Sequence, residues 1–266
     1  LIVDCEERFF TGLKAAAWEA ARENLKFIAL SGPTCSGKTT TAKRLTEELK
    51  KVGREVVTVS IDDFFLNRSE LFARAEREGI PLDMDSVKAI DLALLQEVIR
   101  SLLLCLPTEI PHFDFSEGKR TGFSLLTPHK EDIYLFEGIQ AIYPEVTSLF
   151  DREALLKIFI SVGEGIETPW GGLSPCDLRL LRRLVRDSKF RGTGAGVTFG
   201  NWAGVRANEE KNIEPYRGSC DLFLDSGMLY EPCVMREPAL SLLEGLPAES
   251  PHAKKAEALC EVLRGF

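Results

Sequence analysis

A glycine-rich loop that ends in lysine and threonine is the segment of the sequence best suited to chemistry. It reads Gly-Pro-Thr-Cys-Ser-Gly-Lys-Thr over residues 32–39, after an apolar run and before a helix-like stretch. Backbone N–H groups in such a turn, with the positive end of the next helix, can surround a polyphosphate. Lys38 would reach the terminal phosphates, and the Thr39 hydroxyl would bind Mg²⁺. The pattern therefore predicts a purine nucleoside triphosphate, held by Gly32, Pro33, Thr34, Cys35, Ser36, Gly37, Lys38, Thr39 and Thr40.

Two acidic sites follow strand-like segments, where they could act on the bound nucleotide. Asp62 and Asp63 come at the end of one such segment, and Glu137 directly follows another. Open α/β sheets bind ligands beyond the carboxyl ends of their strands. Phosphoryl transfer to a hydroxyl needs Mg²⁺ to neutralise charge and a base to orient or accept the proton. Asp62 fits the base and Glu137 the metal ligand, direct or through water, with Asp62 and Thr39 also in the candidate metal set. The alternative for each acid is a helix cap or a solvated loop charge.

Arginines gather on one side of a predicted helix at residues 177–190. At roughly 100° per residue, Arg179, Arg182, Arg183 and Arg186 fall within an arc of about 100°, opposite leucines and a valine. Such cations repel one another unless anions satisfy them, and a solvated basic stripe is the alternative. Because the helix leads into the glycine-rich segment 192–196, we expect a mobile lid over about 177–200 that closes positive charge over the phosphoryl group.

The elements that must position these residues alternate between strand-like and helix-like segments. This order predicts an α/β fold with a mostly parallel sheet and helices on both faces. The predicted strands are Phe27–Ser31, Glu55–Ile61, Ile133–Phe136, Leu156–Val162 and Leu222–Leu224, with an edge strand at Glu109–Phe115 because a proline inside it cannot donate to a ladder. The predicted helices are Glu7–Asn24, Lys38–Lys51, Asp91–Leu104, Asp177–Phe190, Phe199–Asn212 and Glu249–Leu263.

The composition fits one large globular domain over residues 1–266 and argues against several classes of partner. The chain has 266 residues, is 44% hydrophobic and carries a formal net charge of −8. An acidic chain is poorly suited to broad contact with a nucleic-acid backbone. Seven scattered cysteines and three histidines indicate neither a disulfide framework nor a zinc site. The longest apolar run, residues 102–106, is too short to span a bilayer, so we expect a cytoplasmic protein without a membrane partner. The chain starts at leucine rather than methionine, which leaves room for a missing N-terminal extension.

Six segments in order resemble the uridine kinase and phosphoribulokinase family of P-loop kinases. They are the phosphate loop and residues 60–65, 84–91, 110–115, 136–139 and 182–187. The resemblance, strongest to bacterial uridine kinase-like nucleoside kinases, implies a P-loop NTPase fold and transfer of a phosphoryl group from Mg-ATP to a nucleoside 5′-hydroxyl. By position, it implies that Asp62 is the general base and that Thr39 and Glu137 are Mg²⁺ ligands. It also implies self-association. Further implied site residues are Asp85 and Arg183 at the ribose, Arg186 and Arg191 as lid arginines facing phosphate, and Arg120 in the substrate-side loop.

Three positions depart from the family's pattern. Phe113 and Gly118 stand where pyrimidine kinases of the family have a Tyr and a His that read the base. A site without its hydrogen-bonding partners loses discrimination, so the base preference is open. His112 is expected to face the opposite side of its strand from Phe113. Thr193 stands where the family often has another lid arginine.

Three other functions are alternatives to a nucleoside kinase. One is a kinase of the same family that acts on another small hydroxyl compound, such as a sugar phosphate or a pantothenate-like acid. Another is a non-catalytic nucleotide-binding module, which would be expected to lack the acids around Mg²⁺, whereas Asp62 and Glu137 are present. A regulatory GTPase would need a guanine-reading Asn-Lys-x-Asp motif, which does not occur in the sequence.

Overall fold

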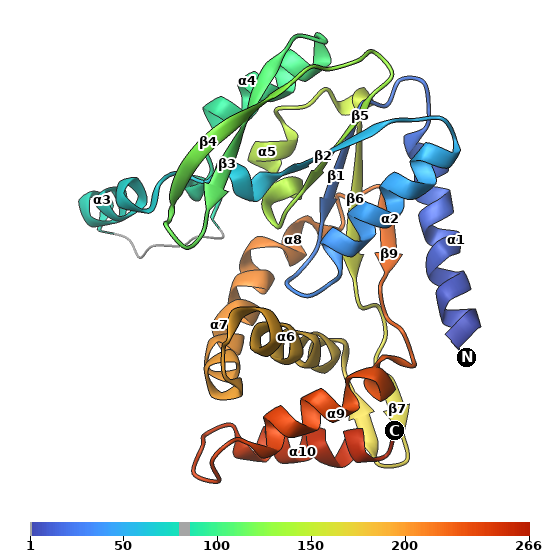
Figure 1. Cartoon of the computed structure of the whole chain (residues 1–266), viewed down its shortest axis with the longest axis vertical. Helices are drawn as coiled ribbons and strands as arrows, with labels where there is room; N and C mark the ends of the chain where they lie inside the picture. The colour runs from blue at the N-terminus through green and yellow to red at the C-terminus, as the bar shows by residue number, and fades with distance from the viewer. Residues whose placement is uncertain (1, 80–85) are drawn as a thin grey trace.

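A five-stranded parallel sheet forms the centre of the computed structural model, which describes residues 2–79 and 86–266 (Figure 1). Its strands run in the order β2-β5-β1-β6-β9, and every neighbouring pair is parallel. The α/β fold predicted from the sequence is therefore confirmed. The bounds are β1 Phe27–Ser31, β2 Val56–Ser60, β5 Ile133–Glu137, β6 Leu155–Ser161 and β9 Leu222–Asp225.

Both faces of this sheet are covered, because side chains alternate along each strand. From β1, Phe27 and Ala29 join one hydrophobic core, whereas Ile28 and Leu30 join another. The first core includes apolar residues of α4 (Leu92–Leu103), and the second includes those of α1 (Ile2–Ala20) and α2 (Lys38–Lys51). A strand buried on both faces reads as a continuous apolar run, as β1 does.

A further layer lies beyond the carboxyl ends of the strands (Figure 1). It has a hydrophobic core of its own, built mainly from α6, α9 and α10 with residues of α7 and of the β7–β8 hairpin. The bounds are β7 Ile166–Thr168, β8 Gly171–Leu173, α6 Pro175–Arg191, α7 Ala195–Asn212, α9 Glu231–Glu244 and α10 Ala253–Arg264. This layer covers the edge of the sheet at which ligands are expected.

The remaining elements are short or lie beside the sheet. A second hairpin, β3 Thr108–Asp114 with β4 Lys119–Leu126, forms a separate two-stranded sheet. The other helices are α3 Arg68–Glu78, α5 Pro144–Thr147 and α8 Glu214–Arg217, with single-turn 3₁₀ segments at Ile61–Phe64, Val87–Ala89, Gln140–Ile142 and Arg152–Ala154. None of the helices in the described part of the chain is both long enough and apolar enough to cross a membrane.

Several expectations about these elements are wrong. The helix predicted at Glu7–Asn24 spans Ile2–Ala20, and the one predicted at Glu249–Leu263 spans Ala253–Arg264. The strand predicted at Glu109–Phe115 is not an edge of the main sheet, because it pairs with β4, where Pro111 lies opposite Phe123. The helix predicted to begin at Phe199 begins at Ala195, so part of the glycine-rich segment is already helical. Gly192, with φ of 62°, caps the end of α6. The connection between α6 and α7 is thus only three residues long, 192–194.

Candidate active site

A cavity of about 750 Å³ opens at the carboxyl ends of the central strands. It brings together most of the residues that the sequence singled out. Its lining includes residues 34–40 of the phosphate loop, Asp62, Glu137, Arg183, Arg186 and Arg191. Gly32 and Pro33 lie just behind this lining, where their carbonyl oxygens accept hydrogen bonds from Lys38 Nζ at 2.8 and 3.1 Å.

The phosphate loop has the backbone shape that its glycines predict. Gly37 has φ of 92° and directly precedes the first turn of α2. A Cβ on Gly32 would come within 2.0 Å of the carbonyl oxygen of Ile160 on β6, so only glycine fits there. Cys35 adopts φ of 56° although it is not glycine, a conformation that is uncommon for such residues and concentrates at ligand-binding sites. The loop therefore turns its backbone into the cavity at the positive end of a helix.

Lys38 is buried at the base of this loop, and its environment prepares it for an anion. Burial lowers the pKa of the Lys38 ammonium, an effect that Glu137 and Asp62 partly offset. Burial removes the water that would stabilise the charged ammonium. A phosphate oxygen placed beside the ammonium would stabilise that charge instead. The geometry thus favours Lys38 as the cation that meets the outer phosphates of a nucleotide.

The two predicted acids reach the same cavity from neighbouring strands. In the register of β2 and β5, Ser60 lies opposite Glu137, and Asp62 follows in the 3₁₀ turn. Burial raises the pKa of the Glu137 carboxyl, with Lys38 acting in the opposite direction. Asp63 has another role, because its carboxylate accepts the backbone N–H of Phe113 at 3.1 Å and so ties the β3–β4 hairpin to the turn. Of the two adjacent aspartates, Asp62 is the one that lines the cavity.

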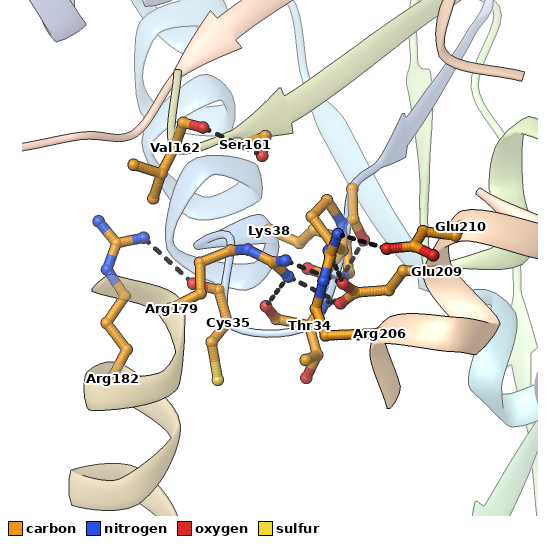
Figure 2. Close-up of polar contacts among 12 residues, drawn as sticks. Thr34, Cys35, Lys38, Ser161, Val162, Arg179, Arg182, Arg206, Glu209 and Glu210 are labelled. Carbon is orange, nitrogen blue, oxygen red and sulfur yellow. Dashed lines mark hydrogen bonds and ion pairs between the residues drawn. The ribbon is translucent and has the colours of Figure 1, made fainter. Parts of the chain in front are cut away.

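A buried ion pair holds the first half of the phosphate loop (Figure 2). Arg179 on α6 donates to both carboxylate oxygens of Glu209 on α7, at 2.7 and 2.8 Å. Arg179 also donates to the carbonyl of Thr34 at 3.0 Å, and the Thr34 N–H donates to Glu209 at 3.0 Å. The pair therefore satisfies both backbone groups of Thr34. Arg179 therefore differs from the predicted set of arginines that face phosphate, because it is 3% exposed and a protein carboxylate neutralises it.

A second ion pair holds the next residue of the loop. Arg182 makes two hydrogen bonds to Glu231 on α9, at 2.6 and 2.7 Å, and donates to the carbonyl of Cys35 at 3.1 Å. Figure 2 shows Arg179 and Arg182 on the same helix, each directed at the loop. α6 is therefore fastened to the phosphate loop through the carbonyls of two successive residues.

The other arginines of α6 share one buried carboxylate. Asp187 lies 3.2 Å from Arg183, 2.8 Å from Arg186 and 3.5 Å from Arg191. All three arginines line the cavity. The sequence predicted no role for Asp187, Glu209 or Glu231. Asp187 could have been found from its four-residue spacing to Arg183 and Arg191. Glu209 and Glu231 could not, because they lie 30 and 49 residues from their arginine partners in the sequence.

Two predicted substrate-binding residues lie outside the lining of this cavity. Phe113 packs between the rings of Phe65 and Phe115, with centroids 5.7 and 5.2 Å away. Arg120 pairs with Asp91 at 3.2 Å. His112 is exposed and contacts Ser124 across the hairpin, whereas Phe113 is buried, and the ladder is irregular between these two residues. Asp85 lies outside the described residues.

The donor set suits Mg²⁺ bound to a nucleotide rather than a metal bound by protein alone. In the described ranges, no three His, Cys, Asp or Glu side chains gather as a metal site. Mg²⁺ in phosphoryl-transfer sites typically binds one or two carboxylates together with substrate phosphates and water. The Thr39 hydroxyl with the Asp62 and Glu137 carboxylates, all in the cavity lining, matches that description.

The part of the chain that resembles known proteins includes the central sheet, the phosphate loop and α6. The model of the Phosphoribulokinase / Uridine kinase family matches residues 27–229. The chain belongs to this family. A uridine kinase of Deinococcus deserti is 28% identical over 219 residues, which cover 81% of this chain and 92% of that protein. A uridine kinase of Lactobacillus helveticus is 26% identical over 204 residues, covering 75% and 86%.

Solved structures from this family share the fold. A possible uridine kinase from Bacillus stearothermophilus superposes with a TM-score of 0.52 at 16% identity, covering 84% of this chain and all of that one. The phosphoribulokinase from Rhodobacter spheroides gives a TM-score of 0.51 at 18% identity, covering 75% of this chain and 69% of that one. The family's P-loop fold is thus confirmed, and α1 lies upstream of the family match.

Proposed function

We propose that this protein is a nucleoside kinase that transfers the γ-phosphate of Mg-ATP to the 5′-hydroxyl of a ribonucleoside. The observation that carries the proposal is the presence of Asp62, Glu137 and the phosphate loop on one cavity. The similarity to uridine kinases over most of the chain supports the same reaction. A phosphate loop alone would fit many nucleotide-binding proteins, whereas a loop with a facing carboxylate fits transfer to an alcohol.

In this proposal, the loop and Lys38 hold the phosphates while acids on the facing strands serve the acceptor and the metal. Loop N–H groups and the Lys38 ammonium bind the phosphate oxygens. The Thr39 hydroxyl and Glu137, with Asp62 adjacent, would hold Mg²⁺, which neutralises charge on the phosphates when bound. Asp62 accepts a hydrogen bond from the acceptor hydroxyl and takes its proton as the new P–O bond forms.

The arginines at the end of α6 supply positive charge to the transferring group. Arg186 and Arg191 face the cavity but share Asp187 in the described structure. When a triphosphate is bound, the γ-phosphate can replace or join Asp187 as their anion, which stabilises charge in the transition state. In this proposal Arg183, which pairs with the same carboxylate, contacts the ribose of the acceptor. We also propose that residues at about 177–200 form a lid, which closes over the transferring phosphoryl group.

A second candidate is a family kinase whose acceptor is another small hydroxyl compound. The observation that favours it is the pair Phe113 and Gly118, which offers no polar side chain to read a pyrimidine. Phe113 is instead part of an aromatic cluster on the β3–β4 hairpin. The phosphate and metal chemistry would be unchanged.

A panel of acceptors separates these candidates. The purified protein is incubated with Mg-ATP and single ribonucleosides, deoxynucleosides, sugar phosphates or pantothenate, and ADP release is followed with a coupled assay. The expected result is ADP release with at least one ribonucleoside, with the 5′-monophosphate identified by mass spectrometry. Turnover only with a sugar phosphate or pantothenate would favour the second candidate. ATP binding without turnover on any acceptor would contradict both and indicate a binding module.

A further inference from the structure

One aromatic residue of the cavity comes from a helix that the family match does not include. Phe9 lies on α1, and the match begins at residue 27. Phe9 and Met228 both line the cavity. Neither has a part in the phosphate, metal or acceptor chemistry described above. A flat aromatic ring and a thioether are side chains that pack well against a planar base.

The order of the strands places these two residues at the end of the cavity opposite the acids. Asp62 and Glu137 follow β2 and β5, which lie to one side of β1 in the sheet. Met228 follows β9, which lies to the other side of β1, at the edge of the sheet. α1 packs against α2 and β9 (Figure 1). Gly12 of α1 is so close to β9 that an added Cβ would come within 3.2 Å of Leu224.

A triphosphate bound to the loop after β1 therefore lies between two different ends of the cavity. The transferring phosphate must lie toward Asp62, because that side chain acts on the acceptor hydroxyl. The nucleoside end then extends in the opposite direction, toward Phe9 and Met228. The cavity of about 750 Å³ is large enough to hold both an acceptor and a donor.

Polar contacts fix α1 to the loop that carries Met228. The Tyr230 hydroxyl donates to Glu6 at 2.5 Å, and Arg8 donates to the carbonyl of Gly227 at 3.3 Å. Arg8 also lies 3.6 Å from Asp225, whose carboxylate accepts the Gly227 N–H at 2.8 Å. Residues before and after Met228 are thus tied to the same helix turn that presents Phe9. The two segments that carry Phe9 and Met228 are therefore held together at the cavity.

We propose that Phe9 and Met228 form the subsite for the base of the donor nucleotide. This inference rests on the proposed use of a nucleoside triphosphate, and it adds α1 to the donor site. The base stacks on the Phe9 ring and contacts the Met228 thioether. Because these side chains offer no hydrogen bonds to the base edge, the subsite recognises a purine by its face and discriminates weakly between adenine and guanine.

The test compares a ligand with a base and a ligand without one. Dissociation constants for ATP and for inorganic tripolyphosphate are measured by calorimetry on the wild type and on Phe9→Ala. Stacking contacts of this kind change affinity by about tenfold or more when the ring is removed. The expected result is an ATP affinity about tenfold weaker in Phe9→Ala, with tripolyphosphate affinity unchanged.

Trp18→Ala is the matched control, since Trp18 is an exposed aromatic residue of the same helix and is not part of the cavity lining. Its affinities for both ligands should equal those of the wild type. Phe9→Leu keeps apolar volume without a flat ring and serves if Phe9→Ala does not fold; it should also weaken ATP and spare tripolyphosphate.

Two results would overturn the subsite. One is an unchanged ATP affinity in folded Phe9→Ala or Phe9→Leu. The other is an equal loss for both ligands, which would show that α1 only supports the loop. Failure of the proposed function looks different, because wild-type protein would then bind ATP without phosphorylating any acceptor, or would bind neither ligand.

Discussion

Glu209 on α7 and Arg179 on α6 form a buried two-bond ion pair that encloses the backbone of Thr34 from both sides. The carboxylate accepts the Thr34 N–H and the guanidinium donates to the Thr34 carbonyl. Two helices far from the loop in sequence thereby set the conformation of the segment that receives the nucleotide. The pair is a positioning device, since its hydrogen bonds are directed at protein, and Arg206 binds the same carboxylate.

We expect Glu209→Gln to lower both the stability of the protein and its affinity for ATP. Removing one partner of a buried ion pair leaves an uncompensated charge and costs about 3–5 kcal/mol. The midpoint of urea unfolding and the ATP dissociation constant measure the two effects. Glu210→Gln is the control, because Glu210 is exposed and pairs with Arg206 at 3.3 Å rather than with Arg179. Equal changes in the urea midpoint and in the ATP dissociation constant for both variants would show that Glu209 does not hold the Thr34 backbone.

Asp62→Asn is expected to abolish phosphoryl transfer while ATP binding is largely retained. A general base typically contributes about 10²–10⁴-fold to the rate, and its loss acts on the acceptor rather than on the nucleotide. Asp63→Asn separates this role from local structure, since Asp63 holds the backbone of Phe113. The second variant should lose some stability and keep transfer. Steady-state kinetics with wild-type turnover in Asp62→Asn would refute the assignment.

The pH dependence of kcat/KM should report Glu137. Burial raises the pKa of this carboxyl, so the free enzyme protonates it at a higher pH than an ordinary glutamate. Protonation removes a metal ligand, and activity should therefore fall on the acid side at a higher pH than an ordinary glutamate would give. Higher Mg²⁺ favours the ionised form and should shift this acid limb to lower pH. A limb insensitive to Mg²⁺ would exclude Glu137 as its source.

Asp187→Asn should make the folded protein more dependent on a bound phosphate. The substitution leaves Arg183, Arg186 and Arg191 without their shared anion, so the ligand-free protein loses stability and a bound triphosphate restores more of it. The increase in Tm on addition of Mg-ATP should exceed that of the wild type. Asp177→Asn is the control on the same helix, and it removes the partner of Lys255 on α10. This variant should lower Tm without enlarging the ATP-induced increase in Tm.

The base preference can be tested at Phe113 alone. Phe113→Tyr restores a hydroxyl at a position where the family's pyrimidine kinases have one, and should raise kcat/KM for uridine and cytidine relative to adenosine. Adding histidine at Gly118 is a poor test, because Gly118 has φ of 66° and a Cβ there would come within 2.5 Å of the Arg68 side chain. An unchanged preference in Phe113→Tyr would mean that the acceptor base binds elsewhere.

The strands and the phosphate loop could be predicted because their signals are local. β1 is a continuous apolar run, and the loop has its glycines and lysine at fixed spacing. Hydrophobic periodicity likewise located α2 and α6. The hairpin partner β4 was missed, since its strand is mostly exposed and lacks a buried face. α9 was missed as well, because Pro238 lies inside this helix and its amphipathicity is weak.

The arrangement of charges was predicted less well for a different reason. The positions of Arg179 and Arg182 on their helix were correct, but their partners Glu209 and Glu231 lie on other helices. No local pattern joins residues 30 or 49 positions apart. Phe9 was placed within a predicted helix, yet only the packing of α1 against β9 brings it to the cavity.

The two ion pairs of α6 also restrict how this helix can move. Arg179 and Arg182 bind carboxylates and loop carbonyls in its N-terminal half, whereas Arg186 and Arg191 lie in the half that ends at Gly192. Swinging the whole helix outward would break four guanidinium–carboxylate hydrogen bonds at once. Because the N-terminal half of α6 is anchored in this way, we expect any movement that admits substrate or releases product to occur at its C-terminal end.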